Sequence, residues 1–266
     1  MSKLRVTLIQ TELFWEDVQK NLSHFTNKIS TLSSATDLIL LPEMFTTGFT
    51  MNPEKNAENH GGEGLHWMMD VAEKKNAVLC GSMAVRENED YFNRMYWVRP
   101  DRTFTYYDKH HLFRMAGEDK HYKAGNRNVI VELMGWKINL QICYDLRFPV
   151  YSRNRWESEN NFEAAYDVML YVANWPEVRS HPWKTLLMAR AIENQSFVIG
   201  INRVGKDGNG IAHSGDSAVI SPRGEIISNI LPNEDSTETI ELNRDFLVEF
   251  RKQFPVGMDA DKFKLF

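Results

Sequence analysis

Short apolar runs alternate with amphipathic stretches along most of the chain. Leu4 to Gln10 has the composition of a strand, and Asp37 to Leu41 has that of a second strand. Between them, apolar side chains recur at alternating steps of four and three, the spacing of one helix face: Val18, Leu22, Phe25, Ile29 and Leu32. The pattern predicts a βαβ unit at the start of an α/β protein, not a helical bundle or an all-β sandwich.

The same reasoning predicts the later elements. A helix over Leu65 to Lys75 precedes a strand over Ala77 to Val85. Turn residues then separate paired apolar runs, which predicts two hairpins: Tyr91 to Val98 with Thr103 to Tyr107, and Val129 to Leu133 with Trp136 to Ile142. Antiparallel hairpins inside a βα-rich chain indicate a mixed sheet.

The last third continues the alternation. The predicted elements are a strand over Asp167 to Ala173, a helix over Pro182 to Asn194, and strands over Phe197 to Asn202, Ser217 to Ile220 and Glu225 to Ile230. No repeat or Pro/Ser-rich linker interrupts the sequence, which predicts one continuous domain over residues 1–266. Residues 255–266 are expected to form an irregular C-terminal tail.

Composition and charge exclude several classes of protein. Apolar residues make up 42% of the 266 residues, enough for a deep core and too many for a disordered chain. The net charge of −5 is spread along the sequence without a basic stripe, which argues against nucleic acid as a partner. The apolar stretch near the N-terminus is too short for a signal peptide or a membrane span. We therefore expect a cytoplasmic protein without membrane partners.

Three reactive side chains each follow an apolar strand: Glu43, Lys109 and Cys143. Ligands of open α/β sheets collect beyond the carboxyl ends of the strands, so these three ends can converge on one site. The other cysteine, Cys80, lies within an apolar run and is interpreted as a buried hydrophobic residue.

A thiol, a carboxylate and an ammonium together suit acyl transfer. The thiol of Cys143 is the candidate nucleophile, and it needs help to lose its proton at neutral pH. Glu43 can take that proton, pass it to a departing amine and then activate water. Lys109 and the backbone amide of Tyr144 are the candidate donors to the developing oxyanion.

Three blocks around these residues resemble the signature blocks of the nitrilase superfamily: Leu40 to Phe45, Tyr107 to Phe113 and Ile142 to Pro149. The resemblance continues through Met188 to Val198 and His213 to Ile227. It implies a four-layer αββα sandwich with two mixed β-sheets, frequent assembly as a homodimer, and a reaction without a cofactor. It also places the family's Glu, Lys and Cys triad on Glu43, Lys109 and Cys143, and an auxiliary second glutamate on Glu118.

The stretches Leu40 to Phe49 and Cys143 to Asn154 are similar to the ω-amidase branch of that superfamily. This similarity implies hydrolysis of the terminal amide of 2-oxo-dicarboxylate monoamides, such as 2-oxoglutaramate, through a cysteine thioester. An N-carbamoyl-amino-acid amidohydrolase, a nitrilase and a non-catalytic binding protein of the same fold are the alternatives.

The implied substrate carries a carboxylate, for which an arginine fork is suited. Arg147, Arg114 and Arg179 are all close to the signature blocks, and the residues alone do not choose among them. Tyr144, Arg147 and Trp175 are the candidate substrate-binding residues.

Other polar groups have simpler interpretations. His110 and His111 are adjacent, so they point to opposite faces of an extended segment, and we predict no metal site there. Asp145 and Arg147 are predicted to form a local ion pair beside Cys143. Arg190 and Glu193, three residues apart on a predicted helix, are expected to pair as well.

Overall fold

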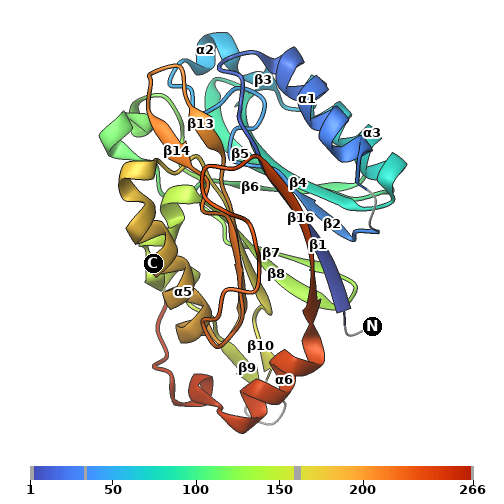
Figure 1. Cartoon of the computed structure of the whole chain (residues 1–266). Helices are drawn as coiled ribbons and strands as arrows, with labels where there is room; N and C mark the ends of the chain where they lie inside the picture. Colours follow the sequence, from blue (N-terminus) through green and yellow to red (C-terminus); the bar gives the residue numbers. More distant parts are fainter. Residues whose placement is uncertain (1–2, 33–34, 159–162, 265–266) are drawn as a thin grey trace.

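The first half of the chain, together with the late strand β16, builds a mixed sheet of seven strands (Figure 1). The computed structural model describes residues 3–32, 35–158 and 163–264. Strands β1, β2 and β4 run parallel, and β16, β5 and β6 extend the sheet by antiparallel pairing. The strand order is β16 (Ser236–Asn243), β1 (Lys3–Gln10), β2 (Leu38–Leu40), β4 (Val78–Glu87), β5 (Asp90–Val98) and β6 (Phe104–Asp108), with β3 (Glu58–Asn59) beside the end of β4.

The second half builds a five-stranded mixed sheet. Its order is β15 (Ala218–Ile220), β12 (Phe197–Ile201), β11 (Val168–Val172), β8 (Trp136–Ile142) and β7 (Val129–Leu133). The three central strands are parallel and the two edge strands are antiparallel. Two small ladders lie outside the sheets: β9 (Trp156–Ser158) with β10 (Glu163–Ala164), and β13 (Val204–Lys206) with β14 (Ala212–Ser214).

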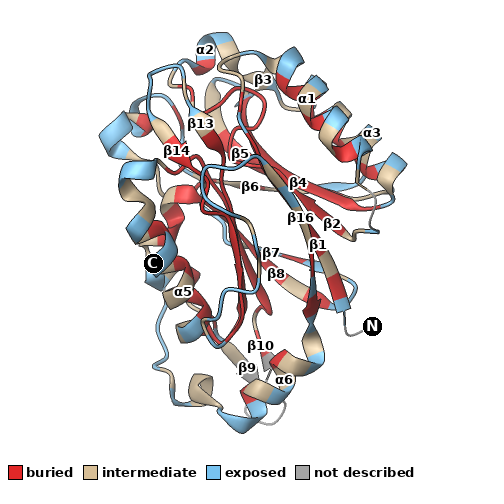
Figure 2. Cartoon of the chain, viewed as in Figure 1, coloured by how far each residue is buried: buried red, intermediate tan, exposed pale blue. Residues whose placement is uncertain are grey.

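The two sheets pack face to face through the largest apolar cluster of the molecule. In β1, Leu4, Val6 and Leu8 join this cluster, whereas Ile9 points to the other side. That side is covered by α1 (Val18–Ser30) and α3 (Glu63–Lys75), and α5 (Ser180–Asn194) covers the second sheet. Figure 2 shows both sheets as buried layers between helices that are exposed on their outer faces. The predicted αββα sandwich with two mixed sheets is therefore confirmed.

Short helical segments connect these layers. They are α2 (Pro53–Asn56), α4 (Pro149–Ser152), α6 (Arg244–Gln253), and the 3₁₀ turns η1 (Arg114–Ala116), η2 (Glu118–Lys120), η3 (Cys143–Arg147), η4 (Glu177–Arg179) and η5 (Val256–Asp259). Among the described residues, no helix is long and apolar enough to cross a membrane.

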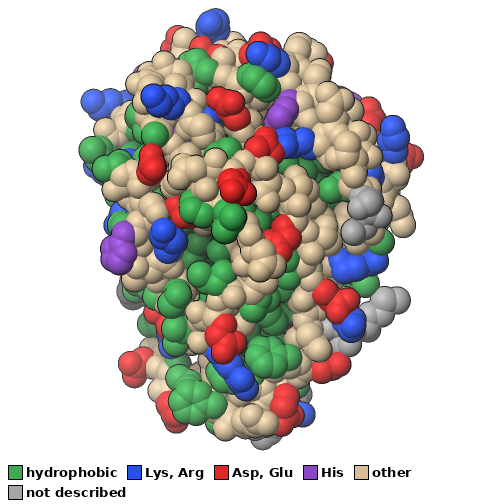
Figure 3. Space-filling model, in the orientation of Figure 1, with side chains coloured by type: hydrophobic (Ala, Val, Ile, Leu, Met, Phe, Trp, Pro, Cys, Tyr) green, Lys and Arg blue, Asp and Glu red, His purple; other side chains and the backbone are tan. Residues whose placement is uncertain are grey.

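One predicted element is wrong. The segment 225–230 was expected to be a strand, but only an isolated bridge joins Ile226 to Ile220. The hydroxyl of Ser228 accepts the hydrogen bond of the Val219 amide that a regular ladder would give to a backbone carbonyl. The segment instead runs as a loop over the front of the molecule in Figure 1, and Ile226 is more than half exposed. In the same orientation, Figure 3 shows hydrophobic side chains at the surface of this face.

Candidate active site

The carboxyl ends of β2, β6 and β8 meet where the two sheets join. Glu43 lies three residues beyond β2, Lys109 directly follows β6, and Cys143 directly follows β8. The Lys109 ammonium donates to Glu43 Oε1 over 2.8 Å, and Cys143 and Lys109 line the same pocket. Glu43 and Lys109 are at most 1% exposed and Cys143 is 8% exposed. The structure thus brings together the three side chains expected from the strand-end pattern.

The backbone at Cys143 is strained. Its φ of +43° lies in the left-handed region, which side chains other than glycine rarely adopt. Cys143 is also the first residue of the η3 turn, so the chain changes direction sharply as it leaves the buried strand β8. Because of this change of direction, the thiol lines the pocket. A side chain that continued the strand would instead point into the core.

Glu118 completes the charged cluster. Lys109 Nζ lies 3.1 and 2.9 Å from its two carboxylate oxygens. The Phe113 amide donates to Glu118 Oε2 over 2.6 Å, which fixes the carboxylate from the other side. Gly117, with φ of +76°, permits the turn that places Glu118 next to Lys109. The second glutamate implied by the family resemblance is therefore adjacent to the lysine.

Two asparagines that the sequence analysis did not single out hold the carboxylates. Asn93 Nδ2 donates to Glu43 Oε1 over 2.8 Å and to Glu118 Oε1 over 3.2 Å. The Asn174 amide donates to Glu43 Oε2 over 2.7 Å, and its side-chain amide donates to the Glu43 carbonyl. Asn174 follows the carboxyl end of β11, so the rule that found the triad applied to it as well. Asn93 lies within β5 and not after a strand end, so the same rule did not indicate it.

Burial and mutual charge shift the pKa values in this cluster. Burial raises the pKa of the Cys143 thiol well above its usual value, Glu43 raises it further, and Lys109 opposes both effects. For Lys109, burial lowers the pKa, but Glu118 and Glu43 outweigh burial and raise it, so the side chain stays an ammonium. Burial raises the pKa of Glu118 against the effect of Lys109. The resting nucleophile is consequently a neutral thiol beside an ammonium and a carboxylate.

Aromatic side chains form the walls of the pocket above Cys143: Phe49, Phe113, Tyr144 and Trp175. Two of the three candidate arginines line it too. The Arg147 guanidinium lies 5.1 Å from the Trp175 ring centre, and that of Arg179 lies 5.3 Å from the ring centre of Phe113. Neither has an ion-pair partner among the described residues. Arg114 is exposed and lines a different depression of the surface.

The hairpin of β13 and β14 supplies the remaining wall through Asp207, Ile211 and His213. His213 is 4% exposed, and burial together with the charge of Arg203 lowers its pKa to about 4. Its ring is therefore neutral near pH 7. The sequence analysis did not connect His213 with the site.

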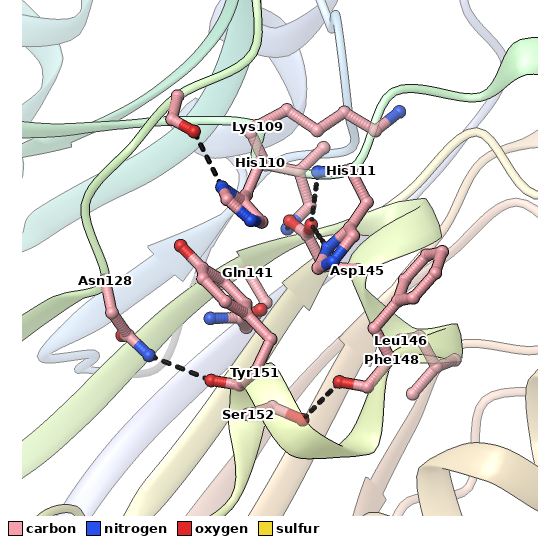
Figure 4. A network of polar contacts seen from close by, with 12 residues as sticks. Lys109, His110, His111, Asn128, Gln141, Asp145, Leu146, Phe148, Tyr151 and Ser152 are labelled. Carbon is pink, nitrogen blue, oxygen red and sulfur yellow. Dashed lines mark hydrogen bonds and ion pairs between the residues drawn. The ribbon is translucent and has the colours of Figure 1, made fainter. Parts of the chain in front are cut away.

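The predicted ion pair between Asp145 and Arg147 is wrong. The Asp145 carboxylate, fully buried, accepts hydrogen bonds from Tyr107, His111 and Ile142 instead, and Figure 4 shows those from His111. These donors satisfy all the acceptor positions that Arg147 would otherwise use, which leaves Arg147 free to line the pocket. The predicted pair of Arg190 and Glu193 is confirmed, at 2.9 Å.

No cluster of three or more metal-binding side chains occurs within residues 3–32, 35–158 and 163–264. Figure 4 shows His110 and His111 turned to separate partners. The ring of His110 bonds to the Gly125 carbonyl over 2.7 Å, whereas that of His111 bonds to Asp145 over 2.8 Å. The two imidazoles are thus already engaged within the protein.

Comparison with known proteins gives concordant matches. The sequence pattern of the carbon-nitrogen hydrolase family matches residues 5–252. The chain is 46% identical to the omega-amidase YafV of Escherichia coli strain K12 over the full length of both, and 31% identical to the 2-oxoglutaramate amidase of Bacillus subtilis strain 168, covering 98% of each. The crystal structure of XC1258 from Xanthomonas campestris, a CN-hydrolase superfamily protein with an arsenic adduct in its active site, superposes with a TM-score of 0.96, at 42% identity and full coverage of both chains.

Proposed function

Because the chain belongs to the carbon-nitrogen hydrolase family, the nitrilase superfamily, we propose that it is an ω-amidase acting through a cysteine thioester. Its substrates are the terminal amides of small 2-oxo-dicarboxylate monoamides, as the names of the 2-oxoglutaramate amidase relatives suggest. The observation that carries the proposal is the strained, buried Cys143 beside the Glu43–Lys109 ion pair. A non-catalytic binding protein of the same fold would not need a buried ion pair of this kind beside a cysteine that lines a pocket.

In the proposed reaction, the Cys143 sulfur attacks the amide carbon while Glu43 takes the thiol proton. The carbonyl oxygen becomes an oxyanion, which Lys109 and the backbone amide of Tyr144 stabilise. Glu43 then gives its proton to the departing nitrogen, and ammonia leaves a thioester on Cys143. Water, deprotonated by Glu43, attacks the thioester, and the carboxylic acid and the free thiol are released.

Glu118 and Asn93 support this cycle by holding Lys109 and Glu43 in place. Two carboxylates on either side of Lys109 keep its ammonium charged in a site where burial alone would favour the neutral amine. Asn93 donates to both carboxylates and so fixes the separation between them. We propose that Glu118 thereby holds the Lys109 ammonium at the oxyanion position.

The pocket matches a substrate with a charged far end. A small ω-amide that reaches Cys143 with its amide would place its carboxylate among Arg147 and Arg179, whose charges have no carboxylate partner among the described residues. Trp175 and Tyr144 would cover the short carbon chain between the two ends. This arrangement supports the candidate substrate-binding role of Tyr144, Arg147 and Trp175.

The deciding experiment is an assay of ammonia release from a panel of amides. 2-Oxoglutaramate should exceed both glutamine and butyramide in kcat/KM, because an amide without the carboxylate leaves the guanidinium groups unpaired. Losing such contacts costs several kcal/mol, or about a thousandfold. Equal values for the three compounds would reject the ω-amidase assignment while leaving the thiol chemistry intact. N-carbamoyl amino acids and simple nitriles in the same panel test the two rival activities.

We further propose that the enzyme works as a homodimer or higher homo-oligomer. This proposal rests on the family resemblance, which implies frequent assembly as a homodimer. Light scattering coupled to size-exclusion chromatography measures the mass in solution. A particle of the 30.9 kDa chain mass alone would reject this part of the proposal.

A further inference from the structure

Asp145 joins the two sheets at the site, although it lines no part of the pocket. We propose that Asp145 is a positioning residue that sets the Cys143 thiol in register with Lys109 for attack. The proposal rests on the thiol chemistry proposed above. It concerns a residue that touches neither the substrate nor the reacting atoms.

Four donors surround the Asp145 carboxylate, and Figure 4 shows the two that His111 provides. Oδ1 accepts from the His111 amide over 2.9 Å and bonds to His111 Nδ1 over 2.8 Å. Oδ2 accepts from the Tyr107 hydroxyl over 2.8 Å and from the Ile142 amide over 3.0 Å. A carboxylate with two donors on each oxygen is held in one orientation, and it holds its donors equally firmly.

The positions of these donors show which parts of the site the Asp145 carboxylate connects. Tyr107 and His111 stand two residues before and two residues after Lys109, at the end of β6 in the first sheet. Ile142 is the residue before Cys143, at the end of β8 in the second sheet. Asp145 therefore ties the chain around the lysine to the strained turn that carries the thiol. Without this link, the two reactive groups would depend on contacts elsewhere between two separate sheets.

A second connection serves the other half of the site. Asn174, from the second sheet, donates two hydrogen bonds to Glu43, from the first, and the Glu43 amide donates to the Ala173 carbonyl over 3.4 Å. Glu43 and Cys143 are thus positioned through different pairs of strands, β2 with β11 and β6 with β8. The connection through Asp145 acts directly on the turn at Cys143, which Arg190 also contacts by donating to the Leu146 carbonyl over 2.6 Å.

The substitution Asp145→Asn tests this role with almost no change in shape. In either orientation the new NH₂ group faces a backbone N–H, that of His111 or that of Ile142, and cannot accept from it. The turn at Cys143 then relaxes toward less strained angles. Because small displacements of reacting groups cost up to about a hundredfold, we expect kcat to fall at least about tenfold. KM should stay within about threefold, since Arg179 and Trp175 lie outside the η3 turn.

Asp167→Asn is the matched control. Asp167 is also a buried carboxylate of the second sheet, bound by Arg251 over 2.8 Å and by Arg244 over 3.4 Å. It precedes β11 at the end of that strand opposite Asn174, so it is remote from the site. Both variants should lose thermal stability. Only Asp145→Asn should lose kcat.

A second readout does not require turnover. In a Cys80→Ala background, the rate at which iodoacetamide alkylates Cys143 reports how well the site activates the thiol. We expect alkylation to be several-fold slower in Asp145→Asn and unchanged in Asp167→Asn. If the wild-type protein releases no ammonia from any amide, the proposed function fails, and the alkylation rates alone decide the role of Asp145.

Each outcome of these experiments either supports or overturns the positioning role of Asp145. A folded Asp145→Asn protein with wild-type kcat and alkylation rate would overturn the proposal, whatever its stability. If that variant does not fold, Tyr107→Phe replaces it, because it removes one of the four donors and leaves both backbone amides in place. A lowered kcat with unchanged KM in Tyr107→Phe supports the positioning role, and wild-type kcat overturns it.

Discussion

The two arginines in the pocket give the sharpest test of substrate choice. Replacing Arg147 or Arg179 by glutamine keeps an N–H donor, on a shorter side chain, and removes the charge. Both guanidinium groups lie against aromatic rings and have no carboxylate partner among the described residues, so neither substitution breaks an ion pair of the free enzyme. The loss should therefore appear only when a carboxylate-bearing substrate is bound.

The expected size follows from the interaction that is removed. A hydrogen bond to a charged group contributes about 1.5–3 kcal/mol, and each 1.4 kcal/mol is tenfold. The kcat/KM for 2-oxoglutaramate should fall roughly tenfold to a hundredfold per arginine. The kcat/KM for butyramide, which has no carboxylate, should change by less than about threefold. A substitution that damaged the chemistry itself would lower kcat/KM for both substrates alike.

Arg114→Gln is the control, since Arg114 is equally close to the signature blocks in sequence but lies outside the pocket. Its ratio of kcat/KM between the two substrates should equal that of wild type. If Arg147→Gln and Arg179→Gln also leave this ratio unchanged, the carboxylate is not bound where the pocket suggests. The reasoning from unpaired guanidinium groups would then be refuted.

The remaining predictions concern the nucleophile, its partners and the buried histidine. Cys143→Ala and Cys143→Ser should abolish ammonia release with little change in thermal stability, whereas Cys80→Ala should keep its activity; turnover by Cys143→Ala would reject the nucleophile. Glu43→Gln and Lys109→Met should each lower kcat about a hundredfold or more, and values within about threefold of wild type would reject their roles. Because the pKa of His213 is lowered to about 4 from 6.5, the unfolded state takes up its proton first as the pH falls. The free energy of unfolding should therefore drop between pH 6.5 and about 4, and urea titrations of His213→Asn should show a smaller drop than wild type.

The reactive residues at the strand ends could be predicted because the pattern that marks them is local in the sequence. An apolar run followed by a reactive side chain marks Glu43, Lys109 and Cys143 without knowledge of the partner strands. The second sheet was not predictable in this way, since strands buried on both faces, such as β11, show no alternation that reveals what covers them. Its existence came from the family resemblance. The strand β16 and the helix α6 were missed, and β16 has only Ile240 and Leu242 as buried side chains.

The pocket residues were harder for a different reason. Arg147 and Arg179 lie on the short turns η3 and η4, which have no periodicity from which a direction could be inferred. Asn93 lies within a strand, and one buried polar residue in a strand does not indicate which side chains it bonds to. The Asp145–Arg147 pair was predicted from proximity in sequence, but the carboxylate bonds to the nearby Ile142 amide and to Tyr107 and His111, which only the tertiary fold brings close.

The charges of the cluster explain why the nucleophile needs more than one partner. A thiolate formed before attack would add a buried negative charge next to Glu43, which is the interaction that helps to raise the pKa of the Cys143 thiol. Under the proposed mechanism the proton instead passes from sulfur to Glu43 as the bond to carbon forms, and the new charge appears on the substrate oxygen. That oxygen lies at the ammonium of Lys109, which Glu118 keeps charged. Negative charge is therefore moved toward the cation during the attack, and the free thiol need not be acidic at rest.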